Sequence, residues 1–127
     1  MASLNKVMIM GNLGADPEMR YTANGSAVTN FNMAVNESWT DSQGARKERT
    51  EWFTVVTWNK TAENCAKYLA KGSSVFVEGR LQTRSWEADG QKHWKTEVVG
   101  DRVNFISGTR DASADEAYQP TDEDLPF

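Results

Sequence analysis

Residues 51–60, Glu-Trp-Phe-Thr-Val-Val-Thr-Trp-Asn-Lys, carry the side chains whose types and spacing point most directly to a chemical role. Aromatic and β-branched residues dominate the stretch, which predicts a strand. Because strand side chains alternate between faces, Trp52 and Trp58 share one face and Phe53 and Val55 share the other. If Phe53 and Val55 supply a core, two indole rings point outward, as a stacking site for unpaired bases requires. The alternative is that a partner sheet or a second subunit buries both faces.

No grouping of residues in the sequence predicts catalysis or a cofactor. His93 is the only histidine, and no His, Cys and carboxylate residues share a metal-ligand spacing. Trp94 and Lys95 follow it, which favours a place in a loop or at a strand edge over a catalytic role. No Gly-rich phosphate-binding loop occurs. We therefore expect that the protein is not an enzyme, with no catalytic residue, no metal site and no cofactor.

Composition narrows the class of protein further. A chain of 127 residues fits one domain with its own core. Cys65 is the only cysteine, which excludes an internal disulfide and favours a reducing compartment. No apolar run approaches membrane-spanning length, and Met1 does not open a signal-peptide pattern. The composition predicts a soluble intracellular protein with no membrane partner.

The net charge of −4 is unevenly distributed along the chain. Residues 1–110 contain all 14 Lys and Arg against 12 Asp and Glu, a net charge of +2, whereas residues 111–127 contain six Asp and Glu and no Lys or Arg. A mildly basic body thus carries an acidic end. Because +2 is a small charge, any nucleic-acid binding must depend on stacking and on local clustering of basic residues.

Five strands and one helix are expected to position these side chains. Four of the strands are predicted over residues 4–13, 51–60, 74–86 and 93–106. The remaining strand, second in the chain, is predicted to start at residues 20–21 and to continue after a turn through residues 28–35, which alternate between apolar and other side chains. Residues 87–91 contain an Asp-Gly hairpin turn. Residues 59–72 predict the helix, with Asn59 or Thr61 as its cap and Gly72 as its stop.

Several faces can be assigned from the same patterns. Val7 to Met10 are apolar on consecutive positions, so that one face suits a barrel core and the other suits another subunit or a central place in the sheet. Val75, Val77 and Leu81 are expected to point into the core. The helical face that contains Cys65 is expected to be buried, with Cys65 as a small core residue.

Residues 36–50 are predicted to form a polar loop. This segment contains Trp39 and the basic trio Arg46, Lys47 and Arg49. An exposed tryptophan in a charged loop either covers the edge of the barrel or binds a ligand, and the sequence leaves both open.

The order of the elements predicts an all-β fold with one helix. Five strands with a helix between the third and the fourth are typical of an OB-fold, a five-stranded Greek-key barrel that binds oligonucleotides. An SH3-like barrel shares such strands but does not need the helix. The predicted domain spans residues 1–106.

Beyond this domain the composition changes to Ala, Ser, Asp, Glu, Gln and Pro. Residues 107–121 are expected to form a short flexible linker because they cannot bury enough apolar surface to fold. Residues 122–127, Asp-Glu-Asp-Leu-Pro-Phe, combine acidic side chains with a terminal aromatic ring and the carboxyl terminus. That combination suits capture by a partner that offers an apolar pocket and a basic residue.

Short motifs in a fixed order give the chain a family resemblance. They are Asn5-Lys-Val, Gly11-Asn-Leu-Gly-Ala-Asp-Pro-Glu-Met-Arg-Tyr, Asn36-Glu-Ser-Trp, Thr50-Glu-Trp, Tyr68-Leu-Ala-Lys-Gly-Ser, Glu78-Gly-Arg-Leu-Gln-Thr-Arg-Ser-Trp and Thr96-Glu-Val-Val. Over roughly residues 4–106 the chain therefore resembles the bacterial single-stranded DNA-binding proteins. The acidic Leu-Pro-Phe end is a second, independent match. One departure is the linker, which is short here and is usually long and rich in Gly, Gln and Pro in the family.

The resemblance implies an OB-fold, assembly into a homotetramer, no catalysis, and a cytoplasmic, nucleoid-associated location. It places the stacking residues for single-stranded DNA at Trp39, Trp52, Trp58 and Trp86, with Trp58 where phenylalanine is common. It places the phosphate contacts at Arg20, Lys60, Lys71 and Arg84. It also implies that the tip docks replication, recombination and repair proteins through Asp122, Glu123, Asp124, Leu125, Pro126 and Phe127, with Leu125 where isoleucine is usual.

Two other non-enzymatic functions remain open on the residues alone. One is a protein-interaction barrel whose tryptophans form an oligomer interface, and the other is an RNA-binding role like that of the cold-shock domains. The first predicts that Trp52 and Trp58 are shielded in the free protein, and the second predicts a preference for RNA over DNA oligomers.

Overall fold

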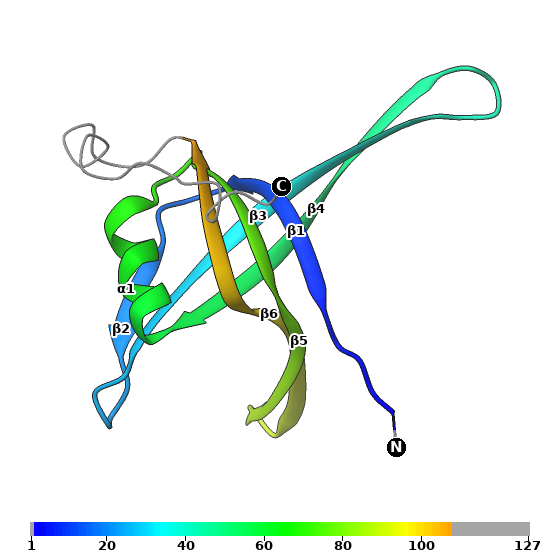
Figure 1. The fold of residues 1–127 in the computed structure, drawn as a ribbon. Helices are drawn as coiled ribbons and strands as arrows, with labels where there is room; N and C mark the ends of the chain where they lie inside the picture. The colour runs from blue at the N-terminus through cyan, green and yellow to red at the C-terminus, as the bar shows by residue number, and fades with distance from the viewer. Residues whose placement is uncertain (1, 108–127) are drawn as a thin grey trace.

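The structure, a computed structural model, describes residues 2–107. The described chain forms strands and one helix in the order shown in Figure 1. The elements are β1 (Val7–Leu13), β2 (Glu18–Tyr21), β3 (Ala27–Thr40), β4 (Arg46–Trp58), α1 (Asn59–Tyr68), β5 (Ser74–Ala88) and β6 (Gln91–Ser107). The predicted linker at 107–121 and the tip at 122–127 lie outside the described residues, apart from Ser107, which ends β6.

Five of these strands close into a barrel. The strands are hydrogen-bonded in the order β1-β5-β6-β4-β3-β2, and a further pairing of β1 with β3 completes the ring. The pairing of β4 with β6 is parallel, and all the other pairings are antiparallel. The short β2 lies outside the ring on the edge of β3. Among the five barrel strands, α1 lies between the third and the fourth, so the predicted OB-fold is confirmed.

The barrel encloses the core that the alternating pattern predicts. Its buried side chains include Phe31, Met33, Val55, Val75, Val77, Val98 and Phe105. Helix α1 packs against β3 and β4 and contributes Ala62 and Cys65, with Leu69 directly after it. Thr29 Oγ1 donates a hydrogen bond to the carbonyl oxygen of Ala62 at 2.7 Å, which ties the helix to β3. The prediction of a buried Cys65 is confirmed.

The prediction of a loop at residues 36–50 is wrong. There β3 and β4 continue as a two-stranded arm that projects from the barrel (Figure 1). The pairing is unbroken from Val28↔Trp58 at the barrel to Thr40↔Arg46 at the tip. Water covers both faces of the arm beyond the barrel, so the arm needs no hydrophobic alternation, which was the signal for strands used above. Cross-strand polar contacts replace apolar ones, such as the ion pair between Glu37 and Arg49 at 3.1 Å.

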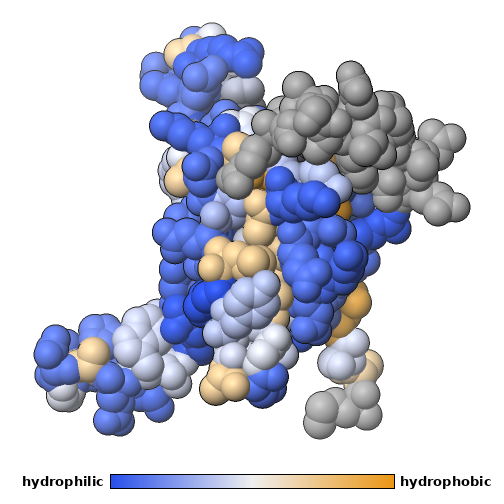
Figure 2. All heavy atoms as spheres, turned by 90° about the vertical axis from the view of Figure 1, so that its left-hand side faces the viewer, coloured by the Kyte–Doolittle hydropathy of each residue, from blue (hydrophilic) through white to orange (hydrophobic). Residues whose placement is uncertain are grey.

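The β5–β6 hairpin forms a second projection. Ala88 pairs with Gln91, so Asp89 and Gly90 form a two-residue turn, as the Asp-Gly signal predicts. Asp89 and Gly90 have φ values of 54° and 76°, the left-handed backbone that such a turn requires. In Figure 2 the arm rises at the top and this hairpin extends at the lower left, and both are mainly hydrophilic.

Three smaller predictions also need correction. Leu81 is 44% exposed rather than buried, because the pairing of β5 with β1 ends at Gly79 and β5 continues toward the hairpin without that neighbour. The residue before α1 is Trp58, and no side chain caps the helix, so neither Asn59 nor Thr61 has the predicted role. The helix ends at Tyr68, and Gly72, with φ of 90°, belongs to the turn that follows.

Candidate nucleic-acid interface

The four predicted stacking tryptophans all have solvent-exposed rings. The exposed fraction is 47% for Trp39, 58% for Trp52, 44% for Trp58 and 39% for Trp86. Trp52 and Trp58 point away from the core on β4, while Val55 is fully buried on the opposite face. At the rise of a β-strand the six residue steps from Trp52 to Trp58 span about 20 Å. Strand alternation therefore presents two rings along one wall of the barrel.

A groove at one end of this wall brings together three predicted site residues. Trp58 of β4, Arg20 of β2 and Arg84 of β5 line a hollow of about 280 Å³. The other lining residues are Asn30, Val56, Gln82, Glu97 and Val99. Two guanidinium groups and an indole ring around one hollow provide what a nucleotide needs, namely charge for its phosphate and a flat surface for its base.

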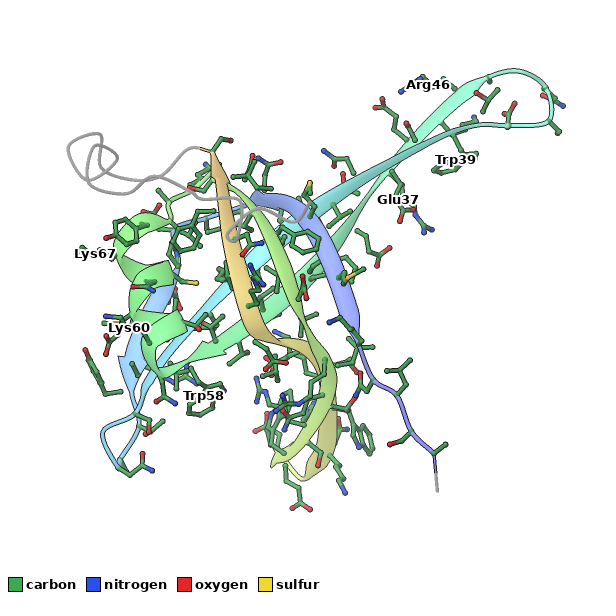
Figure 3. All side chains as sticks on the ribbon, in the orientation of Figure 1. Glu37, Trp39, Arg46, Trp58, Lys60 and Lys67 are labelled. Atoms are coloured by element: carbon green, nitrogen blue, oxygen red, sulfur yellow. The ribbon has the colours of Figure 1, made fainter. Side chains whose placement is uncertain are left out.

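Lys60 carries a positive charge and follows the groove residue Trp58 closely in the sequence. It lies in the first turn of α1, two residues after Trp58 (Figure 3). Its Nζ is 4.0 Å from a carboxylate oxygen of Glu63, and most of the side chain is exposed. Such an exposed ion pair is weak, so the ammonium is free to exchange this carboxylate for a phosphate. The bend that places Lys60 here occurs at Asn59, whose φ of 57° is left-handed and is tolerated well by asparagine.

Trp86 lies in a stack of side chains on the β5–β6 hairpin. The guanidinium carbon of Arg84 is 4.8 Å from the centre of its ring. Arg84 Nε also donates a hydrogen bond to Glu97 Oε1 at 3.0 Å. The His93 ring, directly across the ladder, stacks on Trp86 with the ring centres 5.6 Å apart and the planes 23° from parallel. The hairpin thus presents an aromatic pair with a cation beside it.

Sequence reasoning placed His93 at a strand edge or in a loop and missed this stack. The signal was nevertheless present, because a two-residue Asp89-Gly90 turn sets Trp86 opposite His93 by counting. Trp94, which is 65% exposed and has Lys92 Nζ 5.8 Å from its ring centre, was also missed. It lies on the opposite face of the hairpin from Trp86, because neighbouring strand residues alternate.

Trp52 rests on the chain at the end of β1. A Cβ atom placed on Gly14 would lie only 2.6 Å from Cζ3 and 2.8 Å from Cη2 of the Trp52 ring. The missing side chain of Gly14 therefore makes room for the ring. Two residues later, Asp16 Oδ1 accepts a hydrogen bond from the backbone N–H of Lys71 at 2.8 Å. The turn after β1 thus positions both the Trp52 ring and Lys71, and the role of Gly14 was not predicted.

Trp39 lies apart from the other rings, on the arm. It pairs with Lys47, so both residues of this rung have odd numbers. The rungs of Trp52 and Trp58, which pair with Ala34 and Val28, have even numbers. Trp39 therefore projects from the opposite face of the β3–β4 ladder. Figure 3 shows Trp39 and Glu37 on one side of the arm and Arg46 on the other. The structure thus groups Arg20, Trp58 and Arg84 around one groove. It places Trp52 against Gly14, on the turn whose Asp16 bonds the backbone of Lys71, and leaves Trp39 on the arm.

The buried thiol of Cys65 does not belong to this surface. Burial raises its pKa from the ordinary value of 9.0 to about 12, although a hydrogen bond with Thr57 acts in the opposite direction. Among residues 2–107 no three His, Cys, Asp or Glu side chains form a group that could hold a metal ion. The described part of the chain also has no helix long and apolar enough to cross a membrane.

Comparisons with known proteins identify the family of this chain. The profile of the single-strand binding protein family matches residues 4–106. The chain is 48% identical over 118 residues to single-stranded DNA-binding protein 1 of Chlorobaculum tepidum, an alignment that covers 87% of this chain and 73% of that protein.

Two solved structures share the fold. The Plasmodium falciparum SSB in complex with ssDNA has a TM-score of 0.78 and 32% identity, covering 84% of this chain and 98% of that chain. A deletion mutant of the single-stranded DNA binding protein from Thermus aquaticus has a TM-score of 0.75 and 37% identity over 83% of this chain. The present chain spans about half, 51%, of the Thermus aquaticus chain. It belongs to the single-strand binding protein family, whose members bind single-stranded DNA and are not enzymes.

Proposed function

We propose that the chain binds single-stranded DNA independently of sequence, by stacking bases on Trp39, Trp52, Trp58 and Trp86. The observation that carries this proposal is the groove in which Trp58 meets Arg20 and Arg84. Stacking contributes about 1–3 kcal/mol per base and needs only the flat face that every base has. Four rings therefore offer a gross total on the order of 4–12 kcal/mol. Duplex DNA hides its base faces, so the same surface discriminates against it.

Arg20, Lys60, Lys71 and Arg84 supply the phosphate contacts in this proposal. Each neutralised phosphate on a single strand lowers the logarithm of affinity by about 0.7 per tenfold rise in salt. Four such contacts give a slope of about −3 per protomer. Arg84 already bonds Glu97, so its phosphate contact replaces or shares that interaction.

The assembly and the partners of the protein are also proposals. Met8 and Met10 on β1 are exposed, while Val7 and Ile9 on the same strand pack against the core. The apolar outer face of β1 supports assembly into a homotetramer. The sequence of residues 122–127 supports docking of replication, recombination and repair proteins, and such a protein is expected at the nucleoid.

Titration with oligo-dT tests the proposal, with tryptophan fluorescence as the readout. We expect quenching at low salt, together with much weaker binding of a duplex of the same length. The variants Trp58→Ala and Trp52→Ala should each weaken binding by about 1–3 kcal/mol. Absence of quenching at low salt would contradict DNA binding. Tighter binding of an RNA oligomer would instead support the cold-shock-like function.

A further inference from the structure

Polar rungs on the outer face of the β3–β4 ladder follow a simple pairing pattern. Asn32 lies opposite Thr54, and Asn36 lies opposite Thr50. In both rungs the threonine hydroxyl donates a hydrogen bond to the amide oxygen of the asparagine, at 3.0 Å for Asn32 and 2.8 Å for Asn36. Each of these amide oxygens is therefore paired by the residue across the ladder.

The rung at Asn30 breaks this pattern. Its cross-strand neighbour is Val56, which has no side-chain donor. Asn30 Oδ1 is buried, and within residues 2–107 it has no hydrogen-bond partner. A buried acceptor without a partner is unfavourable, and most buried polar atoms in proteins avoid that state. The position of Asn30 suggests what could pair with this oxygen.

Asn30 lines the same groove as Trp58, Arg20 and Arg84. In this groove the indole ring offers a stacking surface, and the two guanidinium groups offer charge to a phosphate. A stacking surface and a phosphate contact leave the edge of a base without a hydrogen-bond partner. Single-stranded nucleic acids expose the Watson–Crick edges of their bases, and proteins bond these edges with neutral polar side chains. The Asn30 amide is such a group, and rotation about χ2, a soft torsion in asparagine, would turn its buried, unpaired oxygen toward the groove.

We propose that Asn30 Oδ1 accepts a hydrogen bond from an N–H group on the Watson–Crick edge of the base that stacks on Trp58. This inference rests on the proposed binding of single-stranded DNA and adds one contact to it. Thymine and guanine each carry a ring N–H on that edge, and adenine and cytosine each carry an exocyclic amino group. Every base can therefore satisfy Asn30, so the contact is compatible with sequence-independent binding. It selects for an intact base edge.

The test compares oligo-dT with the same oligomer in which every thymine is methylated at N3. Methylation removes the N–H but leaves the ring to stack. For each protein the measured quantity is its preference, the affinity for oligo-dT divided by the affinity for the methylated oligomer. The preference of the wild type should exceed that of a variant without this contact by about two- to tenfold, as expected for one hydrogen bond. Asn30→Ala removes the acceptor. Val56→Thr retains the shape of residue 56 and supplies a hydroxyl like those that pair the asparagines at positions 32 and 36.

Both variants should reduce the preference for the unmethylated oligomer by this factor. The matched control is Asn32→Ala, one rung along the same face, which should retain the wild-type preference. Equal preferences in wild type, Asn30→Ala and Val56→Thr, with oligo-dT still bound, would overturn the role of Asn30 alone. Failure of the wild type to bind either oligomer would overturn the proposed function, and this inference with it.

Discussion

The four tryptophans share an exposed position, but their neighbours give each ring a different setting. Trp52 rests on Gly14, where a Cβ atom would lie 2.6 Å from the ring. Trp86 contacts Arg84 along its own strand and His93 across the ladder. Trp58 faces the groove, and Trp39 lies on the arm. A ring held by its neighbours loses less conformational freedom when a base stacks on it, so in the proposed function these neighbours contribute to affinity indirectly.

Gly14→Ala should displace the Trp52 ring and weaken oligo-dT binding by about 1 kcal/mol, part of the value of one stacking contact. In a Trp52→Ala background the same change should have no further effect, because the ring it displaces is gone. Fluorescence titration of the two single variants and the double variant measures both effects. An equal loss of affinity in both backgrounds would show that Gly14 does not act through Trp52.

Cys65 allows a prediction about pH. Because burial raises the thiol pKa to about 12 in the folded state, the neutral thiol is favoured there. The resulting contribution to stability is complete below pH 9 and is lost as pH rises from about 9 toward 12. Urea unfolding between pH 8 and pH 11 should show a steeper decline for wild type than for Cys65→Ala, by at most about 1.4 kcal/mol per pH unit. Identical slopes would contradict the burial of this thiol.

At the scale of elements, the arm is distinct from the barrel. Its strands continue past the core, and its side chains contact each other across the ladder, as Glu37 and Arg49 do. Surface ion pairs of this kind contribute little to stability. In the proposed function the arm extends the binding surface by carrying Trp39 outward, while the barrel keeps its own core and hydrogen-bonded ring.

Removing the arm should leave the barrel folded. Asn36 lies directly opposite Thr50, so replacing residues 37–49 with Asn-Gly closes the ladder by a two-residue turn. We expect the free energy of unfolding to change little, and oligo-dT affinity to fall by about 1–3 kcal/mol through loss of one stacking ring. The point variant Trp39→Ala should lose the same affinity. A barrel that unfolds without the arm would contradict the independence of the barrel core, and an unchanged affinity would contradict the role of the arm in binding.

At the scale of the whole molecule, the chain combines a body of small positive charge with an acidic end. Residues 111–127 carry six acidic side chains, and residues 1–110 carry all the Lys and Arg. We expect such an end to compete with DNA for the same basic groups, chiefly at low salt. Arg20, Lys60, Lys71 and Arg84 are the groups that it would occupy.

Removal of residues 122–127 should leave or raise the affinity for oligo-dT at low salt. The gain should vanish near 1 M salt, where the screening length falls to about 3 Å from about 10 Å at 0.1 M. Docking of partner proteins should be lost in the same truncated protein. Titrations at both salt concentrations measure the first effect, and pull-down with a purified repair or replication enzyme measures the second. Weaker DNA binding after truncation would show that the tip belongs to the DNA site.

Much of the barrel could be predicted from local patterns. The alternation around Val55 determined which face of β4 is buried, and thereby that Trp52 and Trp58 point outward. The Asp-Gly pair determined the β5–β6 turn, because only a few turn types accept a left-handed backbone at both positions. The arm was missed because a ladder exposed to water on both faces has no hydrophobic alternation.

The composition of the groove was decided by tertiary structure. Arg20, Trp58 and Arg84 come from three strands and meet because the ring closes with a particular register, which no local pattern contains. The same is true of Gly14 beneath Trp52 and of Val56 opposite Asn30. The sequence by itself determined which side chains leave the core, since burial follows a period of two along a strand. Only long-range pairing decided which of them share a site, because the hydrogen-bond register between distant strands sets the neighbours of each residue.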